Sequence, residues 1–225
     1  MIVLSIDTSG VDCAACVYDS AADAVLGEVT ENIGKGHAEL LMGIIDGALQ
    51  QASVTLQEIE RIAVTIGPGS FTGIRVGVAA ARGFALSLGI DAVGVTTLET
   101  LAAHHLREHP GQPVAVGFDA KREECYLQTF AADGSPTSDA ALLSLEDAKA
   151  ILVKFDGVII GSAAPLFAGA ETGSGPDHFL ISTVARIGAQ KPQGMPKPAP
   201  LYLRGPDAKP QSGFALERRA PLQAP

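Results

Sequence analysis

The chain has 225 residues, 47% of them hydrophobic, and its 16 Lys and Arg against 25 Asp and Glu give a net charge of −9. That hydrophobic content excludes a disordered chain, and an acidic surface as a whole repels phosphate backbones. Three Cys residues are too few for a disulfide framework, and no basic, apolar targeting segment precedes Asp7. We therefore expect a globular cytoplasmic protein with no membrane contact, and we expect a partner to hold any nucleic acid.

Residues 1–108 predict a mixed sheet with helices on its faces. Apolar runs bounded by turns indicate buried strands, and apolar residues at helical spacing indicate amphipathic helices. The predicted elements, in chain order, are strands at 2–6, 13–18 and 25–31, a helix at 37–52, a strand at 62–66, a helix at 72–88, a strand at 92–95 and a helix at 97–108. Because a three-strand meander precedes strand, helix and strand units, we expect a mixed sheet flanked by helices.

The beginning of the chain repeats in weaker form after Pro110. Residues 2–18 and 114–130 both read as an apolar strand, an Asp, a short turn and a returning strand, with Asp7 and Asp119 in matching places. Beyond the repeat, the sequence predicts helices at 145–155 and 183–189 and a strand at 158–160. This internal duplication predicts a first lobe at 1–108, a smaller second lobe at 109–204 and a mobile tail at 205–225.

Residues 67–75, Gly-Pro-Gly-Ser-Phe-Thr-Gly-Ile-Arg, join a buried strand to a helix that is unusually rich in glycine. Gly73, Gly77 and Gly83 each cost about 1 kcal/mol relative to Ala, so we expect another backbone to pack close to them. Backbone amides at a helix N-terminus can bind phosphate, but no Lys follows Gly73 as a P-loop requires. Two arginines interrupt the helix, which excludes a membrane span.

Four segments together carry a family resemblance: Ile6-Asp7-Thr8-Ser9, Gly36-His37-Ala38-Glu39-Leu40-Leu41, the glycine-rich segment 67–77, and Asp119-Ala120-Lys121-Arg122-Glu123-Glu124. They resemble the bacterial TsaB family of the actin-like and Hsp70-like superfamily. The similarity covers most of residues 1–130 in the same order, with a fainter match at Tyr202-Leu203-Arg204. It implies an α/β fold with two actin-like (ribonuclease H-like) lobes, whose mixed sheets are flanked by helices.

The resemblance also implies an accessory role in tRNA modification. TsaB proteins support the synthesis of N6-threonylcarbamoyladenosine at position 37 of tRNAs that read ANN codons. They are not enzymes themselves, but pair with a catalytic TsaD subunit, and a small ATPase, TsaE, joins the complex. We therefore expect TsaD-like and TsaE-like partners, a homodimer in isolation, and tRNA contact only through the complex. No cofactor is expected in the chain itself, and ATP at the complex interface is left open.

In this family the partner surface lies on the two helices that begin here near residues 37 and 72. The residues expected at this interface are His37, Leu40, Leu41, Ile44, Ile45, Ser70, Phe71, Thr72, Gly73, Arg75, Val76, Gly77 and Ala80. The glycines of the second helix are interpreted as clearance for a partner helix. The alternative is that both apolar stripes are core of the chain itself.

Two enzymatic hypotheses stand beside the accessory role. An actin-like ATP-dependent phosphotransferase or ATPase would use a phosphate site, against which ordinary turn chemistry is the simpler interpretation. Its weak cofactor-binding candidates are Asp7, Thr8, Ser9, Gly67 and Gly69. A metallo-endopeptidase is opposed by Leu41, which stands where catalytic relatives place a second His after His37, since a single imidazole cannot hold a metal tightly. We therefore predict no catalytic residue and no metal ligand.

Overall fold

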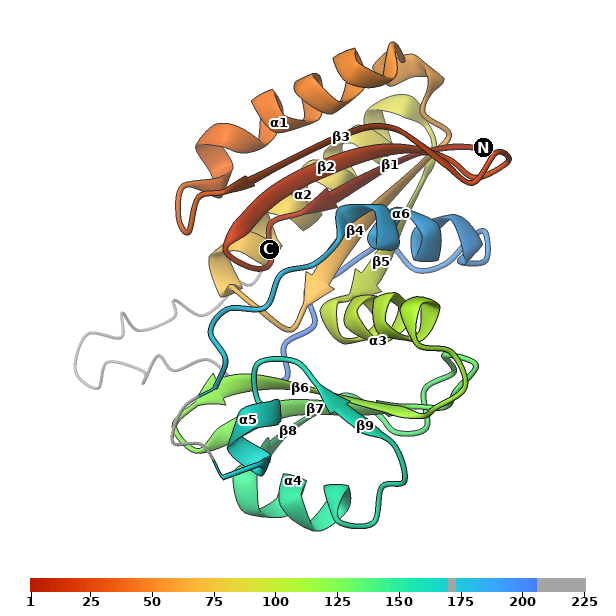
Figure 1. The fold of residues 1–225 in the computed structure, drawn as a ribbon. Coiled ribbons are helices and arrows are strands. Elements are labelled where there is room, and N and C mark those ends of the chain that lie inside the picture. Colours follow the sequence, from red (N-terminus) through yellow and green to blue (C-terminus); the bar gives the residue numbers. More distant parts are fainter. Residues whose placement is uncertain (170–172, 206–225) are drawn as a thin grey trace, which may run out of the picture.

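Two β-sheets, one above the other in Figure 1, form the framework of the molecule. The computed structural model describes residues 1–169 and 173–205. Each sheet has helices packed on both of its faces, so the described chain forms two α/β lobes. The predicted fold class, two lobes with mixed sheets flanked by helices, is confirmed.

The first sheet has the strand order β3-β2-β1-β4-β5. The pairs β1–β2 and β2–β3 are antiparallel, whereas β1–β4 and β4–β5 are parallel. Its strands are β1 (Ile2–Asp7), β2 (Asp12–Asp19), β3 (Ala24–Asn32), β4 (Arg61–Gly67) and β5 (Asp91–Thr96). The antiparallel meander and the parallel crossovers are the two parts that make this a mixed sheet.

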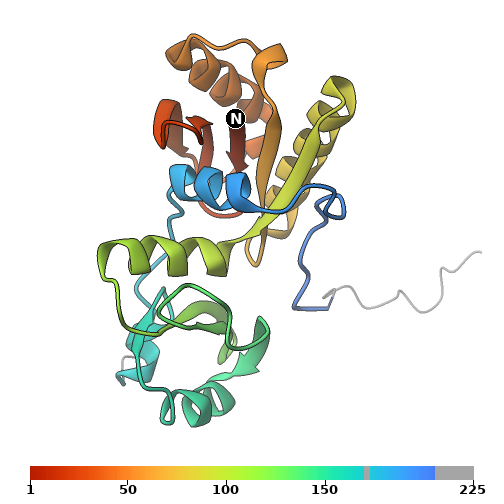
Figure 2. The ribbon, with the colours of Figure 1, turned by 90° about the vertical axis from the view of Figure 1, so that its right-hand side faces the viewer.

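Both faces of the first sheet are buried, because alternate residues of each strand point to opposite sides. Helices α1 (His37–Ala52) and α2 (Phe71–Leu88) cover the face that includes Leu4 and Val64. A short 3-10 helix, η1 (Leu56–Glu58), leads from α1 to β4. The opposite face, with Val3 and Ala63, is covered by α6 (Ile181–Gln190), which Figure 2 shows in blue.

The second sheet repeats the order of the first, as β8-β7-β6-β9. Here too the first three strands are antiparallel neighbours and the fourth runs parallel to β6. Its strands are β6 (Val114–Lys121), β7 (Glu124–Phe130), β8 (Ala141–Ser144) and β9 (Val158–Ile160). Helix α3 (Thr97–Glu108) covers one face, and α4 (Leu145–Leu152) and α5 (Ala164–Phe167) cover the other. This shared order supports an internal duplication.

Helix α6 does not belong to the second lobe, although it lies within the segment 109–204 that the sequence assigns there. It packs Ile181, Val184 and Ala185 against the first sheet, and lies beside α3 at the junction of the lobes. Periodicity identifies the apolar face of a helix but not the sheet that it covers. The expected mobile tail lies outside the described residues, apart from Gly205.

Candidate functional site

The turn after β1 holds a carboxyl group that is closed off from solvent. Asp7 Oδ1 accepts hydrogen bonds from the backbone N–H of Ser9 at 2.9 Å, from the Ser9 hydroxyl at 2.5 Å and from the Thr65 hydroxyl at 2.5 Å. Asp7 Oδ2 is buried without a hydrogen-bond partner. Burial raises the pKa of Asp7 above its usual range, although the bonds from Ser9 and Thr65 act in the opposite direction.

The glycines of α2 pack against this turn. A Cβ atom on Gly73 would lie 1.9 Å from the Thr8 carbonyl oxygen, and one on Gly77 would lie 2.5 Å from Thr8 Oγ1. Thr8 Oγ1 in turn donates a hydrogen bond of 2.7 Å to the Gly73 carbonyl. The expectation that Gly73 and Gly77 provide clearance for a partner helix is therefore corrected: they allow α2 to approach the chain's own backbone.

The glycine-rich loop packs against the same turn, and several of its polar groups have partners within the chain. A Cβ atom on Gly69 would lie 2.3 Å from the Ser9 carbonyl oxygen, which accepts a 2.7 Å hydrogen bond from the Ser70 amide. Ser70 Oγ caps α2 by accepting from the Gly73 amide at 3.2 Å. Asp7 and this loop are thus packed together within the first lobe, and Ser9, Gly69 and Ser70 also line the cleft between the lobes.

Helix α1 has an inner side that faces the first sheet and an outer side that faces solvent. Leu41, Ile44 and Ile45 are buried against the first sheet, whereas Leu40 and Met42 are 42% and 50% exposed. His37 is also buried, with Nε2 at 3.1 Å from the Asp12 carbonyl oxygen. The inner side of α1 is therefore core of the chain itself.

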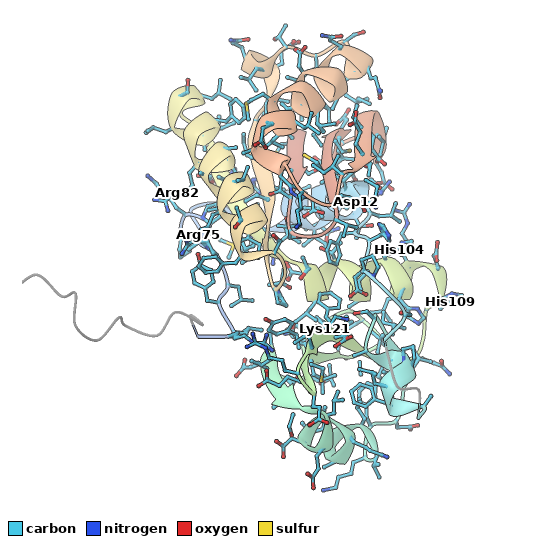
Figure 3. The ribbon with its side chains drawn as sticks, turned by 90° about the vertical axis from the view of Figure 1, so that its left-hand side faces the viewer. Asp12, Arg75, Arg82, His104, His109 and Lys121 are labelled. Atoms are coloured by element: carbon cyan, nitrogen blue, oxygen red, sulfur yellow. The ribbon has the colours of Figure 1, made fainter. Side chains whose placement is uncertain are left out.

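Helix α2 has one exposed side. By length and composition alone it is long and apolar enough to cross a membrane, which differs from the expectation drawn from its two arginines, and 28% of its residues are fully buried. Phe71 is 50% and Leu86 is 79% exposed, while Ile74 and Val78 pack in the core below. Figure 3 views this side of the molecule and labels two arginines along α2, Arg75 and Arg82. The outer side of α2 therefore exposes apolar side chains.

The exposed residues of α1 and α2 form a single surface, which we call the α1–α2 face. A groove of about 490 Å³ lies along α1 and the segment 53–56, with Phe84 as its lining residue from α2, and a second groove of about 420 Å³ lies between the N-terminal ends of the two helices. Among the residues predicted at the interface, those exposed on the face are Leu40, Ser70, Phe71, Thr72 and Arg75, with Val76 and Ala80 partly buried. The others, which the fold buries within the chain, are His37, Leu41, Ile44, Ile45, Gly73 and Gly77.

The sequence interpretation missed part of this face. Among the exposed residues that it left out are Met42, Gly43, Ala79, Arg82, Gly83 and Leu86. Gly43 and Gly83 have open space where a Cβ atom would stand, in contrast to Gly73. The available signal was the helical spacing of Arg75, Ala79 and Leu86, which places them on one side of α2.

Metal ligation finds no support in the described residues. Within 1–169 and 173–205, no group of three or more His, Cys, Asp or Glu side chains is arranged to hold a metal ion. The cleft between the lobes, about 720 Å³, is lined by Asp119 and Asp177, and the Lys121 ammonium pairs with Asp119 at 2.6 Å. Asp177 accepts hydrogen bonds from the backbone and hydroxyl of Ser162.

Comparison with known proteins relates the chain to tRNA-modification proteins. The family model for tRNA N6-adenosine threonylcarbamoyltransferase (TsaD) matches residues 20–160. The tRNA threonylcarbamoyladenosine biosynthesis protein TsaB of Buchnera aphidicola (Schizaphis graminum) is 34% identical over 56% of this chain and 58% of its own length. An uncharacterized protein of Mycobacterium tuberculosis is 30% identical over 92% of this chain and 94% of its own. The chain thus spans little more than half of that TsaB relative and nearly all of the mycobacterial one.

Solved structures agree with this assignment. A protein described as uncharacterized, with similarity to peptidase YeaZ from Pseudomonas aeruginosa, superposes with a TM-score of 0.74 at 24% identity, over 90% of this chain and 99% of that one. YeaZ from Pseudomonas aeruginosa gives a TM-score of 0.57 at 28% identity, over 64% of this chain and 69% of its own. The first match shows the shared fold. With the sequence matches, the chain belongs to the family that the TsaD model describes and is a homologue of its TsaB members.

Proposed function

We propose that the chain is a non-catalytic subunit of the machinery that makes N6-threonylcarbamoyladenosine at position 37 of tRNAs reading ANN codons. Its role is to bind and support the catalytic TsaD-type subunit through the α1–α2 face. The observation that carries the proposal is the exposed apolar side of helix α2, where Phe71 is 50% and Leu86 is 79% exposed. Exposed apolar surface of this kind is typical of sites that bind another protein or a membrane, and the grooves beside it favour a protein.

The composition of the α1–α2 face suits a protein partner. Its exposed apolar side chains are Leu40, Met42, Phe71 and Leu86. The two grooves are concave, so that side chains of a partner can pack into them. A stable interface buries roughly 800 Å² on each side, which two helices of this length can provide. The pairing also explains how an acidic chain can serve tRNA modification, because the partner would hold the tRNA.

The proposal extends to the remaining members of the complex. A TsaE-like ATPase would join the pair formed by this chain and the TsaD-type subunit in the cytoplasm, and the chain alone would form a homodimer. Catalysis would reside in the TsaD-type subunit, because the turn at Asp7 serves internal packing in this chain. We assign no nucleotide to the chain itself.

A pair of matched substitutions tests the face. Leu86 and Val153 are 79% and 78% exposed, but Val153 follows α4 in the second lobe. We expect Leu86→Asp to weaken binding to the TsaD-type subunit of the same organism by about 100-fold, roughly 2.7 kcal/mol, because the partner would bury its charge. Val153→Asp should bind like the unmodified chain.

Isothermal titration calorimetry measures both affinities, and circular dichroism checks that both variants are folded. If Leu86→Asp binds as tightly as Val153→Asp, the α1–α2 face is not the partner surface. Reconstituted tRNA modification with and without this chain then tests the accessory role itself.

A further inference from the structure

A pocket lies at the edge of the α1–α2 face, beside the N-terminus of α2. Its volume is about 450 Å³, and its apolar walls include Phe71 and Ile74 from α2, Tyr126 from β7, and Leu201 and Leu203 from the end of the described chain. The pocket therefore joins both lobes and the segment 201–204, which we call the C-terminal strap. It shares Phe71 with the proposed partner surface and continues that surface beyond the two helices.

The C-terminal strap is fixed to both lobes. The Leu201 amide donates a 2.8 Å hydrogen bond to the Ile66 carbonyl in β4 of the first lobe. In the second lobe, the Arg204 guanidinium donates to the Ala120 carbonyl at 3.0 Å and to the Glu124 carboxylate at 2.5 Å. Because these bonds hold the wall in place, the pocket is already formed before anything binds, which lowers the entropy cost of binding.

Phe71 and Tyr202 line the pocket, and Arg75 packs on both of their rings; we call these three residues the rim. The Arg75 guanidinium lies 3.8 Å from the centre of the Phe71 ring and 5.6 Å from that of Tyr202, and Arg75 Nε donates a 2.7 Å hydrogen bond to the Tyr202 hydroxyl. The ring centres are 5.1 Å apart, and the two side chains are 50% and 47% exposed. Arg, Tyr and other aromatic residues are the types that dominate binding energy at protein interfaces.

The Arg75 guanidinium at this rim is available to a carboxylate of a partner. The chain carries a net charge of −9, yet none of the described carboxylates forms an ion pair with Arg75. Arg204, close by on the C-terminal strap, is neutralised by Glu124. A partner that offers a carboxylate beside an apolar side chain would therefore satisfy both the rim and the pocket.

We infer that the pocket takes an apolar side chain of the TsaD-type partner, and that a carboxylate next to that side chain pairs with Arg75. This inference rests on the proposed function and adds an anchor outside the two helices. A protein is favoured as the occupant because the pocket is apolar, preformed and continuous through Phe71 with the proposed partner surface.

Substitutions at the rim test the anchor. Tyr202→Ala removes a wall and the ring, and Arg75→Glu reverses the charge, so each should weaken binding to the TsaD-type subunit by about tenfold or more. Tyr202→Phe keeps the ring and should stay within about threefold of the unmodified chain. Lys149→Glu makes the same change of charge at an exposed position of α4 and serves as the control for Arg75→Glu. It should leave the affinity for the TsaD-type subunit unchanged.

The same calorimetric titrations separate the outcomes. If Leu86→Asp abolishes binding while Tyr202→Ala and Arg75→Glu bind normally, the anchor is wrong and the proposed function stands. If all three bind normally, both are wrong. If Tyr202→Ala disrupts only self-association, measured by sedimentation, the pocket belongs to a second copy and the inference is overturned.

A spectroscopic measurement reports on the pocket directly. The chain contains no Trp, so Tyr202→Trp introduces one fluorophore at the rim. After subtraction of the partner's own emission, we expect a shift to shorter wavelength when the TsaD-type subunit is added, because the ring becomes buried. An unchanged spectrum in a complex that calorimetry shows to be formed overturns the inference.

Discussion

The two sides of helix α2 use small residues for opposite purposes. On the inner side, Gly73 and Gly77 let the helix approach Thr8, and nothing larger than hydrogen fits at either position. On the outer side, Gly83 has open space around it and Leu86 is largely exposed. Inner changes should therefore affect folding, whereas outer changes should affect association and leave the fold intact.

The largest effect is expected on the inner side. Gly73→Ala places a Cβ atom 1.9 Å from the Thr8 carbonyl oxygen, a backbone atom that cannot rotate away. We expect the free energy of unfolding to fall by about 3 kcal/mol as α2 is pushed from the turn. Urea denaturation followed by circular dichroism measures the change. A Gly73→Ala protein as stable as the unmodified chain would contradict the close packing described for this side. Gly77→Leu should destabilise the fold for the same reason, so it is unsuitable as an interface variant.

An intermediate effect concerns Asp7, which holds the turn against which the inner side packs. Burial raises its pKa above the usual 3.8. At pH values between the unfolded and the folded pKa, Asp7 therefore keeps its proton in the native state and loses it in the unfolded chain. The stability due to this group is fully present below the unfolded pKa and is lost as the pH rises through the folded pKa.

Asp7→Asn should remove that pH dependence, because its amide oxygen can still accept hydrogen bonds from Ser9 and Thr65 without carrying a charge. We expect the free energy of unfolding of the variant to improve relative to the unmodified chain as the pH rises from about 4 towards neutral. Urea titrations across this range measure the difference. A difference that stays constant with pH argues against a raised pKa in the native state.

The smallest effect has the opposite sign to the first. Gly83→Ala adds a Cβ atom where no heavy atom lies within 4 Å, so only the gain in helix propensity remains. The free energy of unfolding should rise by roughly 0.5 to 1 kcal/mol. The same urea experiment compares Gly83→Ala with Gly73→Ala. If both variants lose the same free energy of unfolding, the inner and outer sides of α2 do not differ in the way described.

Much of the first lobe could be predicted from the sequence, because each of its elements has a clear local period. The strands at 2–6 and 13–18 and the helix at 37–52 match β1, β2 and α1 to within one or two residues. In the second lobe, β8 was not predicted, since three of its four residues are only half-buried and the fourth is exposed, so they do not alternate. Helix α6 was found as a helix but assigned to the second lobe, because its partners in the first sheet lie far away in sequence.

The sequence predicted which two helices form the candidate site, but not which side of each helix is exposed. Apolar residues occur on both sides of α1, and periodicity alone does not tell that Leu41 and Ile44 face the sheet while Leu40 and Met42 face outwards. A glycine likewise indicates that something approaches closely, but not whether this is the chain's own backbone or that of a partner. The contact between Gly73 and Thr8 joins residues 65 positions apart, which no local pattern reveals.

The return of α6 to the first sheet makes the second lobe, in chain order, an insertion within the first. Until α6 has been synthesised, the sheet face with Val3, Ala63 and Val93 has no cover, although all five strands of that sheet are complete by Thr96. On the ribosome, the first lobe therefore stays half-finished while the second is made. Helix α6 can cover that face only after the second lobe has been made, and the C-terminal strap docks on both lobes later still.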